Sequence, residues 1–474
     1  MNPTMIFHSP MRVRSGGSSG SAIRPFMMRT AFAQLGYEVI EVSGTWRERA
    51  QSVPLAKQAV EEGRVEFCYS ELATSPIAMT EKISERVDPA LDFDLFAFCR
   101  ARGVPVGAFY RDVYWRFPGF LTLRQFPNRL LMRHHYKRDL RRLEDSLDLM
   151  FLPSLRMGEY IPRISPEKFR ELPPGAPLAA KGKGTGVELF YVGALGDFYD
   201  LRECVAAVAK TPGASMTLCV PEKQWALLAE AYRPYLSHRV RVVHGRGAEL
   251  EPYFERATIG VLAMKPIEYR SFAAPVKFFE YIGRALPVLA STGTHVADLV
   301  AREGIGWTPE YSRDSIAKTL RELVATPSLV EEAASRVEAL RGEHTWQARA
   351  RQAAAMLAAQ ALSLRNFFLL SAQKLVPPVM RALLDGGETH VDGFLLPGHV
   401  SVVTGTEGFD FLARDYSVPG VVGGFQPLEI LRAVDLLVRQ IAAGEARIEN
   451  AYESVVRREG NPAARAAKER VYEP

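Results

Sequence analysis

The sequence predicts an α/β protein made of two Rossmann-like domains followed by a smaller, three-layer α/β module. Short apolar segments with strand character alternate with helical patterns along most of the 474 residues, which is typical of parallel sheets covered by helices on both faces. A stretch rich in Pro, Gly and Lys at 171–186 separates two alternating segments of similar length. The pattern changes again at 364–365, where a third alternating segment begins.

The first domain is predicted over residues 1–170. TMIFHSP reads as a strand, the loop RSGGSSGS follows it, and the next helix is expected to end near Gly36, before the strand YEVIEV. FDLFAFCRARG, VPVGAFYRD and LDLMFLPS are predicted as further strands. Asp92-Phe93-Asp94 overlaps the start of the first of these and is interpreted as its cap.

The second domain is predicted over residues 187–362, after an interdomain linker at 171–186. Its strands are expected in VELFYVG, ASMTLCV, RVRVVHG, IGVLAMK and ALPVLAST, and residues 312–362 are expected to be largely helical. The third module, 366–474, is predicted to have strands in NFFLLSA, VDGFLLPG and GVVGGF and a long helix in PLEILRAVDLLVRQIAAG.

Composition indicates an ordinary globular protein, with 47% hydrophobic and 24% charged residues. None of the four cysteines forms a CxxC pair, which argues against a disulfide framework or a cysteine metal cluster and favours a cytoplasmic location. No apolar run reaches the roughly 20 residues that span a bilayer, and the N-terminus does not read as a signal peptide. The net charge is +8 over residues 1–365 and −3 over 366–474, so the front of the chain is expected to meet anions.

The loop after the first strand contains Gly16 and Gly17 and leads into a helix. Backbone N–H groups at such a loop approach phosphate closely, at the positive end of the helix dipole. The loop lacks a complete GxGxxG or Walker pattern, so a βα turn without ligand is an equally good interpretation.

The segment APVKFFEYIGRALPVLASTGT at 274–294 carries a more specific signal. With YVGALGDFYDL, GIGW and TWQARARQAAAML around it, the first 362 residues resemble GT-B glycosyltransferases of the group 1/family 4 type. The resemblance implies that the second domain holds a nucleotide-sugar donor. Glu280 would then accept hydrogen bonds from the donor ribose, and Lys277 would lie near its phosphates.

Other positions extend this resemblance to a donor-binding set. Backbone amides near Gly293 and Thr294 would contact phosphate, and the loop at Gly193 belongs to the same site. That loop lacks the family's usual cation, for which Lys265 or Arg270 would substitute. The acidic residue that retaining members carry eight positions before Glu280's counterpart is absent, because Phe272 stands there. Outside this context, Lys277 and Glu280 would read as an exposed i,i+3 pair.

Asp112 follows a predicted strand of the first domain and is the candidate general base for an inverting transfer. A simple ion pair with Arg111 or Arg116 is the competing interpretation. The resemblance implies no metal and no cofactor beyond the nucleotide-sugar cosubstrate, with protein cations stabilising the departing diphosphate.

Residues 114–142 combine many cations with aromatic and aliphatic side chains. This composition suits a peripheral contact with the inner face of a membrane that carries a glycan or lipid-linked acceptor. A solvated basic face or an electrostatic collar for an anionic donor explains it equally well. Nucleic acid is not expected, because no recognised binding motif is present.

Residues 366–474 resemble an internal part of the HypD hydrogenase-maturation factors, through VDGFLLPGHVSVVTGTEGFDFLARDYSVPGVVGGFQPLEILRAVDLLVRQ and IENAYESVVRREGNP. That family works through cysteines, which scaffold an iron–dicyano-carbonyl unit and bind an iron–sulfur cluster. Gly420 replaces the cysteine after the Val-Pro step, Gln426 replaces a glutamate, and this segment has no cysteine. A structural role without chemistry is therefore predicted for it.

These observations together predict a glycosyltransferase fused to a truncated HypD-like module. A non-catalytic scaffold in which both modules lost their chemistry is the alternative from another class. A sugar-nucleotide epimerase of the same architecture is a second enzyme alternative.

Overall fold

The computed structural model describes residues 3–15, 20–81, 88, 90–117, 126–196, 198–361, 376–385 and 391–461. The chain divides into two compact units, Met1–Asn366 and Phe367–Pro474. The first unit contains two six-stranded parallel sheets, and the second contains a three-stranded parallel sheet. Each unit is described separately below.

The first sheet of unit 1 has the strand order β2-β1-β3-β4-β5-β6. Its strands are β1 (Thr4–Ser9), β2 (Glu38–Ser43), β3 (Val65–Glu71), β4 (Val106–Phe109), β5 (Leu149–Leu152) and β6 (Phe169–Glu171). The helices are α1 (Gly20–Gln34), α2 (Trp46–Glu61), α3 (Leu91–Ala101) and α4 (Phe126–Ser146), together with α12 (Trp346–Ala361) from the end of the unit. Short 3-10 turns are η1 (Ile77–Met79), η2 (Tyr114–Arg116), η5 (Leu155–Tyr160) and η6 (Pro166–Lys168).

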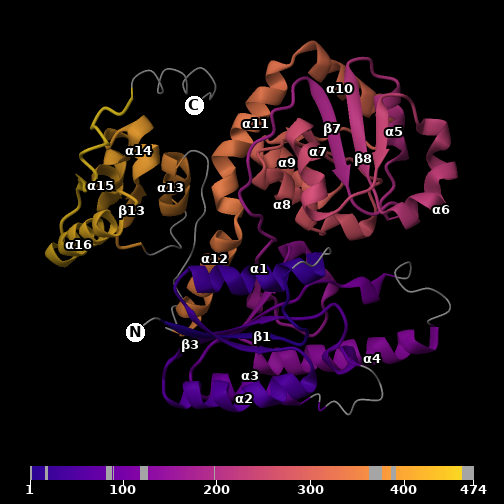
Figure 1. Ribbon diagram of the computed structural model, residues 1–474. Helices are drawn as coiled ribbons and strands as arrows, with labels where there is room; N and C mark the ends of the chain where they lie inside the picture. Colours follow the sequence, from indigo (N-terminus) through magenta and orange to yellow (C-terminus); the bar gives the residue numbers. More distant parts are fainter. Residues whose placement is uncertain are drawn as a thin grey trace. The chain divides into compact units, whose positions relative to one another are not determined.

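The helices cover both faces of this sheet because successive strand residues point to opposite sides. Met5 and Phe7 of β1 pack with α1 and α12, whereas Ile6 packs with α2, α3 and α4. Figure 1 shows α1 above the sheet and α2 and α3 below it. α12 is the last helix of the unit along the chain, yet Trp346 is fully buried in the core of the first domain.

The second sheet of unit 1 has the order β12-β11-β10-β7-β8-β9. Its strands are β7 (Val187–Val192), β8 (Ala214–Cys219), β9 (Val240–Val243), β10 (Ile259–Leu262), β11 (Val288–Ala290) and β12 (Gly306–Trp307). The α-helices are α5 (Arg202–Ala209), α6 (Glu222–Tyr232), α7 (Glu251–Arg256), α8 (Val276–Gly283), α9 (His295–Glu303), α10 (Arg313–Ala325) and α11 (Ser328–Leu340). The 3-10 turns are η7 (Arg233–Tyr235), η8 (Gly247–Leu250), η9 (Glu268–Ser271) and η10 (Arg341–His344).

In both sheets the first strand lies between two later strands rather than at an edge: β1 between β2 and β3, β7 between β8 and β10. The strand order reverses at these points, and a crevice opens there at the carboxyl ends of the strands. The fold therefore places ligand-binding loops after β1 and after β7.

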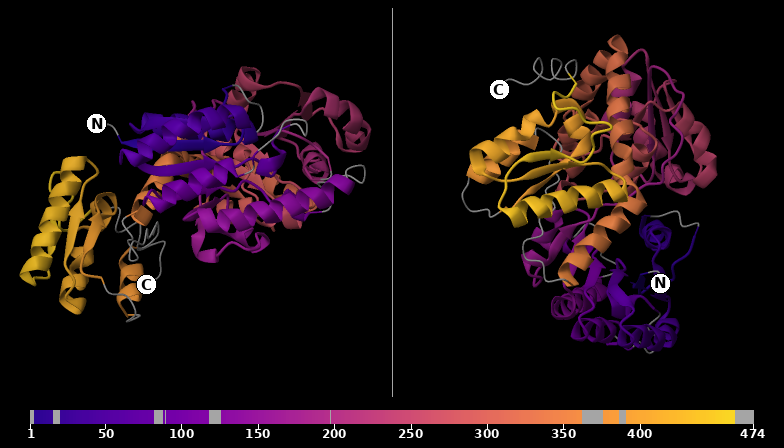
Figure 2. Two further views of the ribbon diagram at one scale, coloured as in Figure 1. Left: turned by 90° about the horizontal axis from the view of Figure 1, so that it is seen from below. Right: turned by 90° about the vertical axis from the view of Figure 1, so that its left-hand side faces the viewer.

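Unit 2 is a three-layer α/β module with the sheet order β13-β14-β15. Val421 of β14 packs on α16, and the neighbouring Val422 packs with α13, α14 and α15 on the other face. The strands appear between helices in both views of Figure 2. The elements are α13 (Val376–Asp385), β13 (Phe394–Pro397), α14 (Gly398–Thr404), η11 (Glu407–Phe409), α15 (Asp410–Tyr416), β14 (Gly420–Gly423), α16 (Pro427–Ala443) and β15 (Ile448–Asn450).

The strand predicted in FDLFAFCRARG is wrong, because Leu91–Ala101 is helix α3. Asp92 is therefore not a strand cap but a buried residue in the first helical turn, where Arg49 and His8 contact its carboxylate. The linker 171–186 packs closely, since Ala176 N–H donates to His344 O and Lys183 N–H donates to Glu255 O. NFFLLSA lies outside the described residues.

Candidate active site

The loops at the carboxyl ends of β7, β10 and β11 bring the predicted donor residues into one region of the second domain. Gly193 follows β7, Lys265 follows β10, and Gly293 with Thr294 connects β11 to α9. Lys277 and Glu280 lie one turn apart in α8, which enters this region after η9. Parallel strands end at a common edge, so residues far apart in the sequence meet here.

The Lys277 ammonium lies directly against Gly193. A Cβ atom on Gly193 would overlap Lys277 Nζ, and the φ of +148° at Gly193 also disfavours other residues. Nζ lies 5.1 Å from the ring centroid of Tyr191 and 5.4 Å from that of Tyr199. Two aromatic rings and the backbone of Gly193 therefore hold the Lys277 ammonium beside the loop that follows β7.

Lys277 and Glu280 are partly buried, and this burial shifts the pKa of each side chain. Desolvation lowers the pKa of Lys277 to about 8, with Glu280 opposing the shift and Arg270 adding to it. Desolvation also raises the pKa of Glu280, although Lys277 and Arg284 oppose this shift. The pair therefore places an amine that is cationic below about pH 8 beside a carboxyl group, the kinds of group that suit a diphosphate and a ribose diol.

The other predicted donor residues have different environments. Arg270 is 8% exposed, donates to the carbonyl oxygen of Phe198 and lies 5.1 Å from the Tyr199 ring centroid, so its charge reaches the Lys277 site. Lys265 is exposed, and its backbone N–H donates to Asp200 O. The Thr294 hydroxyl caps α9 by accepting from Ala297 N–H, so only the backbone of Gly293 and Thr294 is left for the predicted phosphate contact. Gly16 and Gly17 lie outside the described residues.

Asp112 follows β4 and contacts the second domain. Tyr269 Oη donates to Asp112 Oδ2 at 2.8 Å, and Tyr114 also donates to this carboxylate. Desolvation raises the pKa of Asp112 to about 7, and these hydrogen bonds limit the rise. Within the described residues Asp112 Oδ1 is buried without a hydrogen-bond partner. Arg111, one partner in the competing ion-pair interpretation, forms an ion pair with Glu71 at 3.5 Å, although its charge also acts on Asp112.

Phe272 occupies the position of the missing acidic residue and is almost fully buried. Its ring contacts Tyr160 and Phe117 of the first domain, with centroid distances of 4.7 and 5.8 Å. An apolar interdomain contact therefore replaces the carboxylate at this point.

The sequence reasoning missed the role of Tyr269. Tyr269 lies 157 positions from Asp112, in a short 3-10 turn, so no periodicity links the two residues. The only feature of the sequence that points to Tyr269 is its place next to Arg270, which is a predicted cation for the donor.

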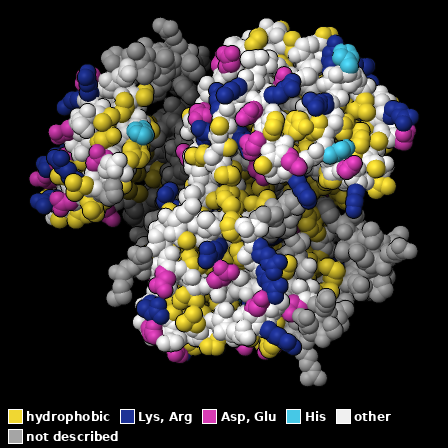
Figure 3. Space-filling view, viewed as in Figure 1, with side chains coloured by type: hydrophobic (Ala, Val, Ile, Leu, Met, Phe, Trp, Pro, Cys, Tyr) yellow, Lys and Arg dark blue, Asp and Glu magenta, His cyan; other side chains and the backbone are white. Residues whose placement is uncertain are grey.

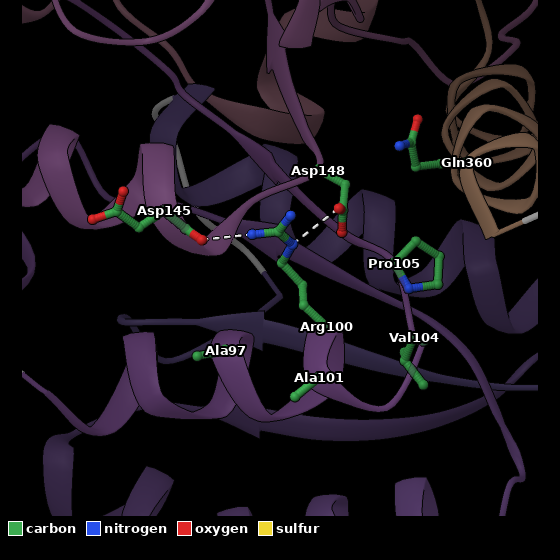
Figure 4. Close-up of a pocket in the computed structure, with 9 residues that line it drawn as sticks. Ala97, Arg100, Ala101, Val104, Pro105, Asp145, Asp148 and Gln360 are labelled. Carbon is green, nitrogen blue, oxygen red and sulfur yellow. Dashed lines mark hydrogen bonds and ion pairs between the residues drawn. The ribbon is translucent and has the colours of Figure 1, made fainter. Parts of the chain in front are cut away.

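Two hollows lie at the surface of the first domain. One of about 390 Å³ lies at the amino ends of β4 and β5, where Arg100 binds Asp148 at 2.9 Å and the carbonyl oxygen of Asp145 (Figure 4). Ligands bind at the opposite, carboxyl ends of such strands, so this hollow is not a candidate. The other, of about 620 Å³, lies after β1 and β2 and is lined mostly by polar residues that include Arg12, Arg14, Glu41 and Glu48.

Comparison with solved structures identifies the architecture of unit 1. The Anabaena protein HepE, crystallised with UDP and glucose, matches with a TM-score of 0.51 at 11% identity, over 75% of this chain and 99% of that one. Sucrose-phosphate synthase from Thermosynechococcus elongatus matches with a TM-score of 0.51 at 15% identity, over 76% and 99%. Unit 1 has the GT-B fold. At these identities the similarity establishes the fold of unit 1 alone.

The end of the chain is similar to HypD. The family model described as "HypD: Hydrogenase formation hypA family" matches residues 345–474. HypD of Rhodobacter capsulatus is 46% identical over 110 residues, and HypD of Escherichia coli is 40% identical over 109 residues. Each alignment covers 23% of this chain and 29% of the relative, so the chain spans less than a third of the length of these curated relatives.

The residues of unit 2 do not fit the iron chemistry that this similarity implies. No cysteine occurs after Cys219 in the sequence. Gly420 lies inside β14, where a Cβ atom would come within 2.9 Å of Ile448 Cδ1 and 3.0 Å of Leu396 Cδ1. His399 packs on Phe425, with ring centroids 4.1 Å apart. Apolar side chains thus close the position at which the family carries its thiolate.

Among the helices in the described residues, none combines the length and the hydropathy of a membrane-spanning segment. Within the same ranges, no three His, Cys, Asp or Glu side chains gather as a metal site would require.

Proposed function

We propose that the GT-B unit transfers a sugar from a nucleotide-sugar donor to an acceptor hydroxyl. The observation that carries the proposal is the Lys277 ammonium resting on Gly193 at the end of β7, with Glu280 one helical turn away. This arrangement matches a cation to a diphosphate and a carboxylate to a ribose. The fold is shared with HepE, whose solved structures contain UDP, glucose and UDP-glucose.

The proposed roles follow from the chemistry of each group. Lys277 and Arg270 would neutralise the departing diphosphate without a metal or another cofactor. In an inverting transfer, Asp112 would take the acceptor hydroxyl proton while that oxygen bonds to the anomeric carbon and the nucleoside diphosphate leaves with the bonding electrons. A pKa of about 7 suits a base that works near neutral pH.

The acceptor is proposed to be a glycan or lipid-linked glycan that enters beside the hollow lined by Arg12, Arg14, Glu41 and Glu48. Arginine and carboxylate side chains suit hydroxyl and phosphate groups. Within 114–142, Lys137 is exposed while Trp115 and Tyr136 are buried and stacked at 5.2 Å. A contact with the inner face of a membrane, in a cytoplasmic protein, would therefore involve the charge of Lys137 rather than the rings of Trp115 and Tyr136. Figure 3 shows basic and acidic side chains interspersed on the visible face of the molecule.

Unit 2 is proposed to be a structural module without hydrogenase-maturation chemistry. The support is the buried Gly420 in place of a thiolate and the absence of cysteine from 366–474.

The direct test is a thermal-shift scan of the full chain with UDP-, GDP- and dTDP-sugars. With whichever donor stabilises the protein, Glu280→Ala should weaken binding by about 1–3 kcal/mol, because a hydrogen bond to a charged group is lost. Glu230→Ala, which removes an exposed glutamate of α6, is the matched control and should bind donor as the wild type does.

Stabilisation by no nucleotide-sugar would refute the transferase proposal. Binding that is unchanged in Glu280→Ala would place the donor elsewhere. Consumption of the donor without any acceptor would instead favour an epimerase.

A further inference from the structure

The 3-10 turn η9 and the residue after it contact both sides of the proposed active site. Tyr269 and Phe272 point to the first domain, whereas Arg270 between them points to the donor residues of the second. The turn lies between β10, whose end belongs to the donor site, and α8, which carries Lys277.

Hydrogen bonds attach this segment to the first domain. Tyr269 Oη donates to Asp112 Oδ2 at 2.8 Å, and Tyr160 Oη donates to Glu268 Oε1 at 3.1 Å. Ser154 Oγ, which is buried, donates to the carbonyl oxygen of Phe272 at 2.6 Å. The last bond fixes the backbone of the segment and therefore the direction of its side chains.

Aromatic rings from both domains surround the Tyr269 ring. Tyr269 stacks on Tyr114 with centroids 5.2 Å apart and an interplanar angle of 20°. It also meets Phe117 at 5.8 Å and Phe272 at 5.2 Å in edge-to-face contacts. Packing therefore holds the ring in one orientation, and its hydroxyl can reach Asp112 only while the two domains are in contact.

On its other side the segment reaches the donor site through Arg270. The guanidinium donates to Phe198 O, and within the described residues its Nε is buried without a hydrogen-bond partner. Its charge contributes to lowering the pKa of Lys277, so the two cations share one site. An anionic donor bound between them would fix Arg270 and, through the backbone, its neighbour Tyr269.

We propose that Tyr269 is a positioning residue that sets the orientation and protonation of Asp112 from the opposite domain, so that the 268–272 segment couples the donor site to the base. This proposal rests on the proposed transferase function. Removing the Tyr269 hydroxyl takes away a donor to the charged form of Asp112, which makes Asp112 easier to protonate. Other ionisable groups that face Asp112 are Tyr110 and Arg111 beside β4, Tyr114 of η2 and Tyr136 of α4.

The test compares the pH dependence of kcat/KM in the full-length wild type, Tyr269→Phe and Tyr160→Phe. Tyr269→Phe keeps the ring contacts and should move the acidic limb upward from near pH 7 by about one pH unit, with roughly fivefold lower activity at pH 7. Tyr160→Phe also removes a tyrosine hydroxyl that crosses between the domains, but not one that bonds Asp112, so its acidic limb should stay in place. Equal loss of activity at every pH in Tyr269→Phe would mean a purely structural role and would overturn the proposal.

A second measurement keeps this inference separate from the transferase proposal. In the full chain with ¹³C-labelled aspartate carboxyls, the Asp112 signal is the one missing from Asp112→Asn. Its titration midpoint should rise in Tyr269→Phe and not in Tyr160→Phe, whether or not any sugar is transferred. An unchanged midpoint would overturn the coupling, whereas a raised midpoint in a protein without transfer activity would refute only the transferase function.

Discussion

Gly193 is the residue on which the geometry of the donor site depends most directly, because any side chain there would occupy the place of the Lys277 ammonium. Gly193→Ala is therefore expected to displace Lys277 and to weaken nucleotide-sugar binding by about 10- to 100-fold, the equivalent of one lost charge-assisted contact. Isothermal titration with the donor measures the effect. Gly342→Ala is the matched control, since a Cβ there meets nothing within 4 Å. Equal affinities for the two variants would contradict the geometry.

Lys277 also makes donor binding sensitive to pH. Its pKa is lowered to about 8, so the side chain is charged below pH 8 and neutral above it. Donor affinity should therefore fall as pH rises through 8, and fluorescence titrations between pH 6.5 and 9.5 would show the change. Lys277→Arg stays charged throughout this range and should abolish that dependence. A wild-type affinity that is flat across pH 8 would mean that the ammonium does not contact the donor.

At the scale of elements, α2 and α3 are held to β1 by a buried ionic cluster. Arg49 donates to Asp92 through Nε at 2.7 Å and Nη2 at 3.1 Å, and His8 Nε2 lies 2.8 Å from the same carboxylate. Burial alone would raise the pKa of Asp92, but the hydrogen bonds and charges of His8 and Arg49 lower it below its usual value. The cluster therefore joins α2, α3 and the carboxyl end of β1.

Breaking this cluster should destabilise the first domain strongly. Asp92→Ala would leave Arg49 buried without its closer carboxylate partner, with Glu81 at 3.8 Å, at a cost of about 3–5 kcal/mol in the free energy of unfolding. Asp94→Ala changes the other carboxylate of the same Asp-x-Asp stretch, which is exposed, and should cost less than about 0.5 kcal/mol. Urea unfolding of both variants gives the comparison. Similar losses in the two would mean that the cluster does not stabilise the fold.

At the scale of the whole molecule, the two units have separate cores. The clusters of unit 1 draw only on residues between Met5 and Leu357, and those of unit 2 only on residues between Met380 and Val456. A fragment of residues 1–366 is therefore expected to fold, to bind the donor and to turn it over as the full chain does. Its melting temperature and kcat/KM, measured beside those of the full chain, test this. A fragment that folds but loses activity would assign unit 2 a role in catalysis.

Local signals in the sequence were sufficient for most of the fold. Alternating strand and helix patterns predict the parallel sheets, because the strand and helix periodicities can both be recognised from residues close together in the sequence. The exceptions are β3, β6, β12 and β15, which are not predicted as strands, and 91–101, which is predicted as a strand although its apolar run satisfies both patterns and forms helix α3. Lys277 and Glu280 could also be found, since one helical turn separates them in a recognisable segment.

The sequence by itself determined the class of the protein, the order of its modules and the chemical types available at the donor loops. Tertiary structure decided which of these groups meet: it placed Lys277 on Gly193, filled the missing acidic position with the interdomain contacts of Phe272, and joined Tyr269 to Asp112. The physical reason is the separation along the chain between the residues that interact. Periodicity and capping act between residues a few positions apart, whereas the pKa of a carboxylate depends on hydrogen bonds and desolvation from segments more than a hundred residues away.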